Sequence, residues 1–264
     1  MSLMINTNIE AYDAHRNLVN TENELSKSMH RLSSGLRINS AADDAAGLAI
    51  SQKLTGQVNG LDQAQRNVQD GVSLVQTAEG SLNQVHAMLQ RVRELAVQYS
   101  NGTLSTSDQG AIQSEVNQLT AEITRIGTTA QFNGIALFSG SSTISFQVGA
   151  NDGETISVTT NAMASIVGTI SLGTSSTLST IDGYIGAVSS QRAAFGAVQN
   201  RLQYTLDNLS TYQENLTASL SRIRDVDMAS EMVNFTKEQI LQQAGTSMLA
   251  QANSAPQSVL KLLQ

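Results

Sequence analysis

Asp43 and Asp44 are the neighbouring carboxylates in this sequence that could do acid–base chemistry. Such chemistry needs a positioned donor and acceptor within hydrogen-bond reach of a substrate. The three histidines that could assist, His15, His30 and His86, are isolated, and none belongs to an HExxH pair. With Ser40 as N-cap, both carboxylates fall in the first turn of a helix, where the helix dipole favours negative charge. We therefore interpret the pair as structural.

Other catalytic motifs are missing from the sequence. It has no cysteine, hence no thiol nucleophile, and it contains neither a GxSxG elbow, nor a Walker A loop, nor a GxGxxG turn. The sequence therefore predicts no enzyme activity, no metal site and no cofactor.

Composition narrows the class of partner. Charged residues make up 14% of the chain, against about 25% in ordinary proteins, so the surface must be rich in uncharged polar residues. Such a surface suits close contact with copies of itself. A net charge of −7 without basic runs or stacking aromatics argues against nucleic acid and against a membrane surface. No Sec signal is recognisable, which by itself predicts a cytoplasmic protein.

Apolar residues repeat every seventh position over 54–96 and over 181–223, and a shorter run over 112–126 keeps 4-3-4-3 spacing. This predicts a mainly α fold, with an antiparallel bundle or coiled-coil rod of three long helices. The predicted rod core consists of Leu54, Leu61, Val68, Val75, Leu82, Leu89, Ile112, Val116, Leu119, Ile123, Phe195, Leu202, Leu209 and Leu216. A capping box at 106–109 should open the short helix, and Gly127 should end it.

The middle of the chain, about 132–180, has a different pattern. Residues 144–148 and 156–158 alternate apolar and polar side chains around a turn at 150–153, which ends in Gly153. This predicts a β-hairpin packed on the rod. Residues 165–180 carry few large apolar side chains and are predicted to form a surface loop.

Helical arms flank the rod at both ends. The residues predicted to pack in these arms are Ile5, Ile9, Leu18, Leu25, Met29, Leu32, Leu36, Met232, Phe235 and Ile240. They are too few to offset an ordering entropy of about 1.5 kcal/mol per residue. We therefore predict that the arms become ordered only when they stack against other copies of the chain.

Four segments carry a resemblance to a known family. Residues 31–50 (RLSSGLRINSAADDAAGLAI) and 237–253 (KEQILQQAGTSMLAQAN) strongly resemble the two terminal signatures of bacterial flagellins. Residues 129–134 (TAQFNG) and 147–153 (QVGANDG) also look like flagellin segments. The resemblance covers essentially the whole chain and corresponds to a short form without the outer variable domains.

This resemblance implies a subunit that polymerises into the flagellar filament. It places 1–44 and 225–264 in the inner tube as helical arms and 45–224 in the outer tube. Gly35, Arg37, Asn39, Asp43 and Asp44 would form the joint between the two. The resemblance also implies export through the flagellar type III channel, which reverses the cytoplasmic prediction, and it implies an export chaperone and hook-associated or cap proteins as partners.

Residues 90–98 look like the segment that Toll-like receptor 5 recognises in stimulatory flagellins. By this resemblance Arg91, Leu95 and Glu115 would contact the receptor. Arg91 and Leu95 are four residues apart and so share one face of a helix. The alternative is that neighbouring subunits cover this face.

Two other functions fit the sequence pattern. A hook–filament junction protein would share the terminal arms, and an intracellular coiled-coil scaffold would share the heptads. Secretion into the medium distinguishes the scaffold, and growth on filament seeds distinguishes the junction protein.

Overall fold

The computed structural model describes residues 7–173 and 177–262. The chain forms two compact units, one from 1–56 with 215–264 and the other from 57–214. Two helices, α2 (Ala45–Tyr99) and α5 (Thr177–Arg224), run from one unit into the other. The prediction of a mainly α fold with a small β element is confirmed.

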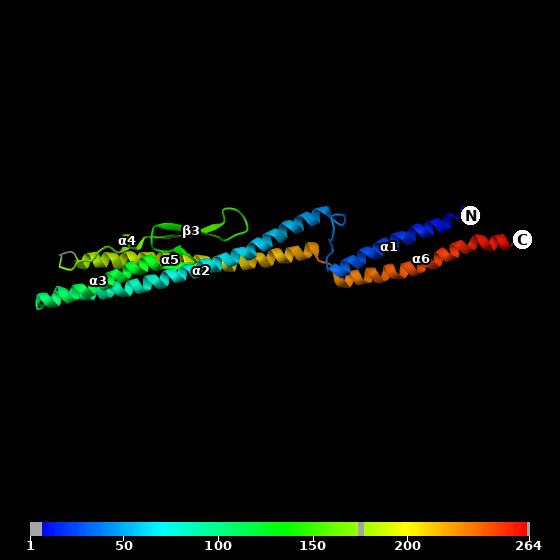
Figure 1. Cartoon of the computed structure of the whole chain (residues 1–264). Coiled ribbons are helices and arrows are strands. Elements are labelled where there is room, and N and C mark those ends of the chain that lie inside the picture. The colour runs from blue at the N-terminus through cyan, green and yellow to red at the C-terminus, as the bar shows by residue number, and fades with distance from the viewer. Residues whose placement is uncertain (1–6, 174–176, 263–264) are drawn as a thin grey trace. The chain divides into compact units, whose positions relative to one another are not determined.

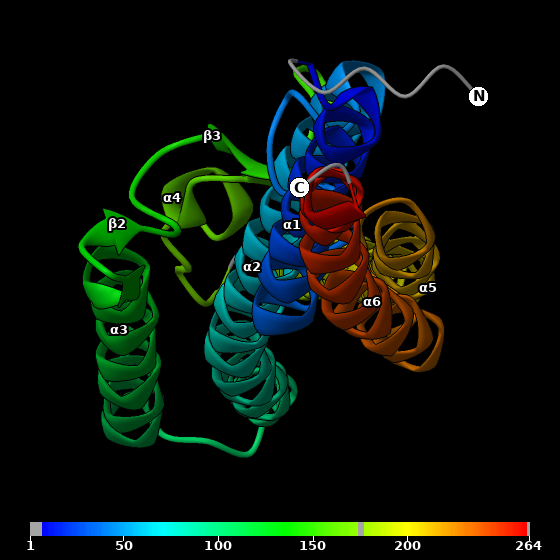
Figure 2. The same ribbon diagram turned by 90° about the vertical axis from the view of Figure 1, so that its right-hand side faces the viewer.

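The first unit pairs the two ends of the chain. Helix α1 (Ile9–Ser34) and helix α6 (Met228–Leu262) lie side by side (Figures 1 and 2). They are antiparallel, because the Asn8 amide donates to the Ala252 carbonyl at one end and Leu36 bridges Asp225 at the other. Asn8 also caps α1 by accepting the N–H of Ala11 at 3.0 Å.

The second unit is built on α2, α5 and the shorter helix α3 (Thr106–Thr129). Contacts between α2 and α5 pair early residues of one with late residues of the other, which makes the two helices antiparallel. These contacts join Gln65 to Gln213, Glu79 to Arg192 and Arg93 to Asp182. The antiparallel bundle expected from the heptads is therefore present in this unit.

The heptad residues supply most of the core of the second unit. Eleven of the predicted core residues are buried: Leu61, Val68, Val75, Leu82, Leu89, Ile112, Val116, Ile123, Phe195, Leu202 and Leu209. The other three, Leu54, Leu119 and Leu216, are only half-buried. For these three the core prediction was too strong, because a heptad position is buried only where another element covers it.

The predicted hairpin consists of β3 (Ser142–Gln147) and β4 (Thr155–Thr160), which pair antiparallel from Ser142 with Thr160 to Gln147 with Thr155. Gly153 in the turn has φ +84°, a conformation that favours glycine. The hairpin packs on α2, where a Cβ added to Gly71 would lie 3.2 Å from the Phe146 ring. In Figures 1 and 2 the green segment that carries β3 and α4 lies along one side of the helices.

The prediction of a surface loop over 165–180 is wrong for 165–173 and 177–180, and 174–176 lie outside the described residues. Helix α4 (Met163–Ile166) leads into a segment in which Ile166, Val167, Ile170 and Leu172 are buried, and α5 already begins at Thr177. These apolar residues lack a regular period, so no repeating pattern indicates that they pack as an irregular segment of the core.

A second small sheet precedes the hairpin. Strands β1 (Gln131–Phe132) and β2 (Ile135–Ala136) pair antiparallel. The turn that joins them consists of Asn133 and Gly134, which both have positive φ. Two consecutive positive φ angles are typical of a type I′ hairpin turn. The sheet follows directly on α3 and begins the turn of the chain back toward the bundle.

The predicted ends of α3 are both shifted. Ser105, not a residue of 106–109, is the N-cap, and it forms the capping box with Asp108. Gly127 does not end the helix, which continues to Thr129. Instead Gly127 is buried against Met163. A Cβ added to Gly127 would lie only 2.5 Å from the Cβ of Met163, so no larger residue fits there. The glycine thus serves close packing of α4 on α3.

Candidate functional site

The candidate site is the joint where the chain leaves α1 and turns toward α2. Gly35 ends α1 with φ +71° and donates its N–H to the Arg31 carbonyl at 2.9 Å. Glycine adopts this left-handed conformation without a steric penalty. The joint pairs with the start of the C-terminal arm, since Val226 N–H donates to the Gly35 carbonyl at 3.1 Å, and with the end of α5, since Arg37 N–H donates to the Arg224 carbonyl at 2.7 Å. Backbone bonds therefore tie the two chain ends together at the joint.

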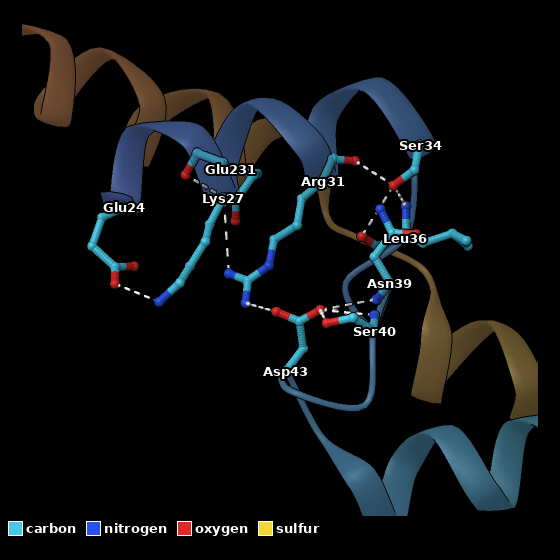
Figure 3. Close-up of polar contacts among 10 residues, drawn as sticks. Glu24, Lys27, Arg31, Ser34, Leu36, Asn39, Ser40, Asp43 and Glu231 are labelled. Carbon is cyan, nitrogen blue, oxygen red and sulfur yellow. Dashed lines mark hydrogen bonds and ion pairs between the residues drawn. The ribbon is translucent and has the colours of Figure 1, made fainter. Parts of the chain in front are cut away.

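Asp43 holds the loop of the joint closed (Figure 3). Its Oδ2 accepts the N–H of Ser40 at 2.9 Å, the hydroxyl of Ser40 at 2.9 Å and the N–H of Asn39 at 3.3 Å. The bonds from the Ser40 amide and hydroxyl hold the pKa of Asp43 below its ordinary value, helped by the Asn39 amide and Arg31 and opposed by burial. The carboxylate is therefore favoured in its charged form.

The predicted N-cap of α2 needs correction. Ser40 does not cap this helix, because its hydroxyl donates to Asp43. The helix begins at Ala45, and Asp44 accepts the N–H of Gly47 at 2.9 Å, as an N-cap side chain does. Both carboxylates thus precede α2 instead of lying in its first turn. Their interpretation as structural groups fits these contacts.

Asp43→Asn should make the chain less stable at neutral pH and should abolish one pH dependence. Because the folded pKa lies below the unfolded value of about 3.9, the contribution of Asp43 is complete above that value. It is lost as the pH falls through the lowered folded pKa. The free energy of unfolding, measured in urea by circular dichroism, should therefore differ between wild type and variant at pH 7 and converge in acid. Asp13→Asn, which removes an exposed pair with Arg16, is the control and should have a smaller effect.

A buried polar pair joins the arms next to the joint. The Ser28 hydroxyl donates to Glu231 Oε1 at 2.5 Å, and both residues are buried. Arg31 lies between this carboxylate, at 4.0 Å, and that of Asp43, at 3.9 Å, as Figure 3 shows. The hydrogen bond from Ser28 to Glu231 is charge-assisted and so stronger than a neutral one, whereas Arg31 acts on the two carboxylates as an ion pair. Arg31 therefore links α1, α6 and the loop of the joint.

Ser28, Arg31 and Glu231 belong to the site without having been predicted from the sequence. Ser28 and Glu231 are 203 positions apart, and neither belongs to a motif that predicts burial. The flagellin-like segment beginning at residue 31 included Arg31 but gave no reason to assign it a partner. Only a polar residue interrupting the apolar face of each arm could have indicated a cross-arm contact.

A cavity of about 490 Å³ lies between α1 and this loop. Its lining residues are Glu24, Lys27, His30, Arg31, Asn39, Ser40, Ala42 and Asp43. Lys27 pairs with Glu24 at 2.7 Å and Arg31 with Asp43 at 3.9 Å, so these charges are matched within the lining. Within 7–173 and 177–262 no group of three or more His, Asp or Glu residues could hold a metal ion.

The arm residues predicted to pack fall into two sets. Five are half-buried in the arm pair: Leu18, Leu25, Leu32, Leu36 and Phe235. Four others, Ile9, Met29, Met232 and Ile240, are exposed in the single chain. Their packing stays a prediction, because it concerns arms stacked against other copies. Ile5 lies outside the described residues.

Among the described residues, helix α1 and residues 228–254 of α6 contain no buried apolar residue. Ser28 is the buried residue of α1, and over 228–254 of α6 the buried residue is Glu231. Large apolar side chains remain exposed along both helices: Ile9, Tyr12, Val19, Met29, Met228, Met232, Val233, Ile240, Leu241 and Met248. An exposed apolar surface of this extent is typical of an interaction site.

Only part of the candidate receptor surface is exposed in the single chain. Arg91 is exposed and pairs with Glu115 on α3 at 3.0 Å and with Glu94 at 3.2 Å. Leu95 is only 2% exposed and belongs to the core of the bundle. Leu95 is therefore covered in the single chain, because α3 and α5 pack around α2 and cover more than its heptad seam, while Arg91 one turn away stays exposed.

Within the described residues no helix combines the length and the apolarity that a membrane span requires.

Similar proteins agree with the architecture described above. A family model of the bacterial flagellin N-terminal helical region matches residues 5–143, and one of the C-terminal helical region matches 178–263. Flagellin of Halalkalibacterium halodurans is 52% identical over 99% of this chain and 100% of its own length. Flagellin of Bacillus subtilis and the flagellar filament 33 kDa core protein of Treponema phagedenis are each 46% identical with the same coverage.

A solved structure supports the same assignment. The crystal structure of Bacillus cereus flagellin is 30% identical and aligns with a TM-score of 0.50, covering 59% of this chain and 94% of that one. The two family models together cover most of the sequence and leave a short central segment between them. By its arms, its bundle and these relatives, the chain belongs to the bacterial flagellin family.

Proposed function

We propose that this chain is the structural subunit that polymerises with copies of itself into the bacterial flagellar filament. The observation that carries the proposal is the arm pair, many of whose large apolar side chains stay exposed while its buried contact is polar. Association with other copies would remove these apolar side chains from water at about 25 cal/mol per Å². Assembly would thus give the arms the apolar burial that they lack in the single chain.

The same observation supports separate places for the arms and the bundle in the filament. The arms, 1–44 and 225–264, are proposed to line the inner tube, and 45–224 the outer tube, where the bundle has a core of its own. Gly35, Arg37, Asn39, Asp43 and Asp44 lie in one short segment whose bonds connect α1 to the start of the C-terminal arm. This supports their proposed role as the joint between the two tubes.

Seeded growth tests the function directly. Purified chain added to short filament fragments should lengthen them, as measured by electron microscopy, because its exposed arms find complementary surfaces at the fragment end. A hook–filament junction protein would add only a short segment and stop. Failure to lengthen fragments under any salt or temperature condition would contradict the proposal.

Export and its partners form a finer part of the proposal. The subunit would leave the cell through the flagellar type III channel, with an export chaperone on its C-terminal arm and hook-associated or cap proteins at the filament ends. Its exposed apolar side chains on α6 supply a surface that a chaperone could cover. Retention of the chain in cells that lack this export channel, and its appearance in the medium of intact cells, would support the route.

Recognition by Toll-like receptor 5 is a second proposed property, now centred on Arg91 and Glu115. Both are about half exposed and their ion pair joins α2 to α3. Arg91→Ala should weaken reporter-cell activation by at least about tenfold if the guanidinium contacts the receptor, since tenfold corresponds to about 1.4 kcal/mol. Arg93→Ala is the matched control, because Arg93 is equally exposed on α2 but pairs with Asp182. Equal activation by wild type and both variants would contradict the proposal.

A further inference from the structure

The methionines of this chain divide sharply by exposure. Met29 on α1 and Met228, Met232 and Met248 on α6 are 57%, 49%, 48% and 64% exposed. On the bundle, Met163 is 3% exposed and Met88 is half-buried. We call the four exposed residues the arm methionines. Met1 and Met4 lie outside the described residues.

Three of the arm methionines lie at one level of the arm pair. Met29 directly follows Ser28 and Met232 directly follows Glu231, the two residues joined by the buried hydrogen bond. Met228 is four residues before Met232 and so lies on the same side of α6. The thioethers are therefore concentrated beside the contact that holds the arms together.

Exposure determines how a thioether reacts. A hydroperoxide transfers one oxygen to the sulfur, which gives a sulfoxide and water from hydrogen peroxide, and accessible methionines react first. The product is polar. Methionine suits an apolar interface, whereas the sulfoxide oxygen is a hydrogen-bond acceptor that loses its water partners when it is buried there. The chemistry needs no group other than the oxidant.

We propose that the arm methionines are an oxidation-sensitive site that controls whether the free subunit can assemble. This inference rests on the proposed function, because it requires the arm faces to be covered by other copies. Oxidation by hydrogen peroxide would place sulfoxide oxygens on faces that assembly buries. Subunits already in the filament would be protected, since the same neighbours that cover these faces exclude the oxidant.

The experiment compares wild type with a Met29→Leu, Met228→Leu, Met232→Leu, Met248→Leu variant. Leucine keeps apolar volume and cannot be oxidised, and all four positions are exposed, so folding should be preserved. Each free chain is treated with hydrogen peroxide, the excess is removed with catalase, and oxidised sites are mapped by mass spectrometry. Growth on filament fragments is then measured by electron microscopy. Met163 is the internal standard for a buried methionine.

In wild type the arm methionines should oxidise at least about tenfold faster than Met163. Elongation should fall by about tenfold or more, whereas the leucine variant should keep its untreated rate. Equal elongation by treated and untreated wild type would overturn the inference while leaving the proposed function intact. Equal loss in the leucine variant would also overturn it and would assign the effect to other residues. If untreated chain fails to elongate, the proposed function itself fails and this inference with it.

Discussion

Replacing Ile240 by lysine is expected to abolish growth of filament fragments while leaving the free chain folded. Ile240 is 65% exposed on α6, so in the single chain a lysine ammonium there stays in water at little cost. If neighbouring copies cover this face, the substitution removes an apolar contact of about 1.5–3 kcal/mol and buries a charge without a partner. Each 1.4 kcal/mol weakens association about tenfold, so we expect at least a hundredfold loss.

The matched control is Ile240→Leu at the same position. It keeps an apolar side chain of the same volume, and such exchanges usually cost less than about 1.5 kcal/mol. Circular dichroism should give the same helix content for wild type and both variants. Lengthening of fragments by the lysine variant at the wild-type rate would show that this face of α6 is not covered in the filament.

Replacing Phe138 by alanine is expected to be the most damaging of the proposed substitutions for stability. Phe138 is 1% exposed, and its ring centroid lies 6.3 Å from that of Phe195 on α5. It follows the strand β2, so it anchors the return of the chain to the bundle. Removing a buried phenylalanine side chain typically costs about 3–5 kcal/mol through lost burial and the cavity left behind. Urea unfolding monitored by circular dichroism should show this loss as a lower midpoint.

Phe132→Ala is the control for this prediction. Phe132 is the same residue type on β1 but is only half-buried, so its removal leaves a smaller cavity and should cost clearly less. A loss below about 1 kcal/mol for Phe138→Ala would place that ring outside the core. Equal losses in the free energy of unfolding for the two variants would show that the difference in burial does not determine how much each ring stabilises the fold.

The repeating local patterns were readable from the sequence. The seven-residue spacing gave α2 and α5, because helical period and side-chain chemistry are recorded in neighbouring residues. The alternation around 150–153 gave the hairpin for the same reason, with Gly153 at the positive φ that the turn needs. The terminal segments 31–50 and 237–253 were specific enough to indicate the family.

The ends of helices were less predictable because competing groups lie close together. Ser105 and Thr106 can each cap the same helix, and the structure uses Ser105. Ser40 and Asp44 compete in the same way before α2, and the Ser40 hydroxyl is taken by Asp43. Gly127 looked like a stop, yet its missing Cβ makes room for Met163. Each choice depends on a contact that the local pattern does not contain.

By itself the sequence determined where the long helices run, where the hairpin turns and to which family the chain belongs. Only the tertiary structure decided that Leu95 is buried, that Ser28 meets Glu231 across 203 positions, and that Ile240 remains exposed. The physical reason is that helical period fixes which face a side chain occupies, but burial depends on what covers that face. In the bundle other helices cover that face. On the arms the described residues of the single chain leave part of the apolar face exposed.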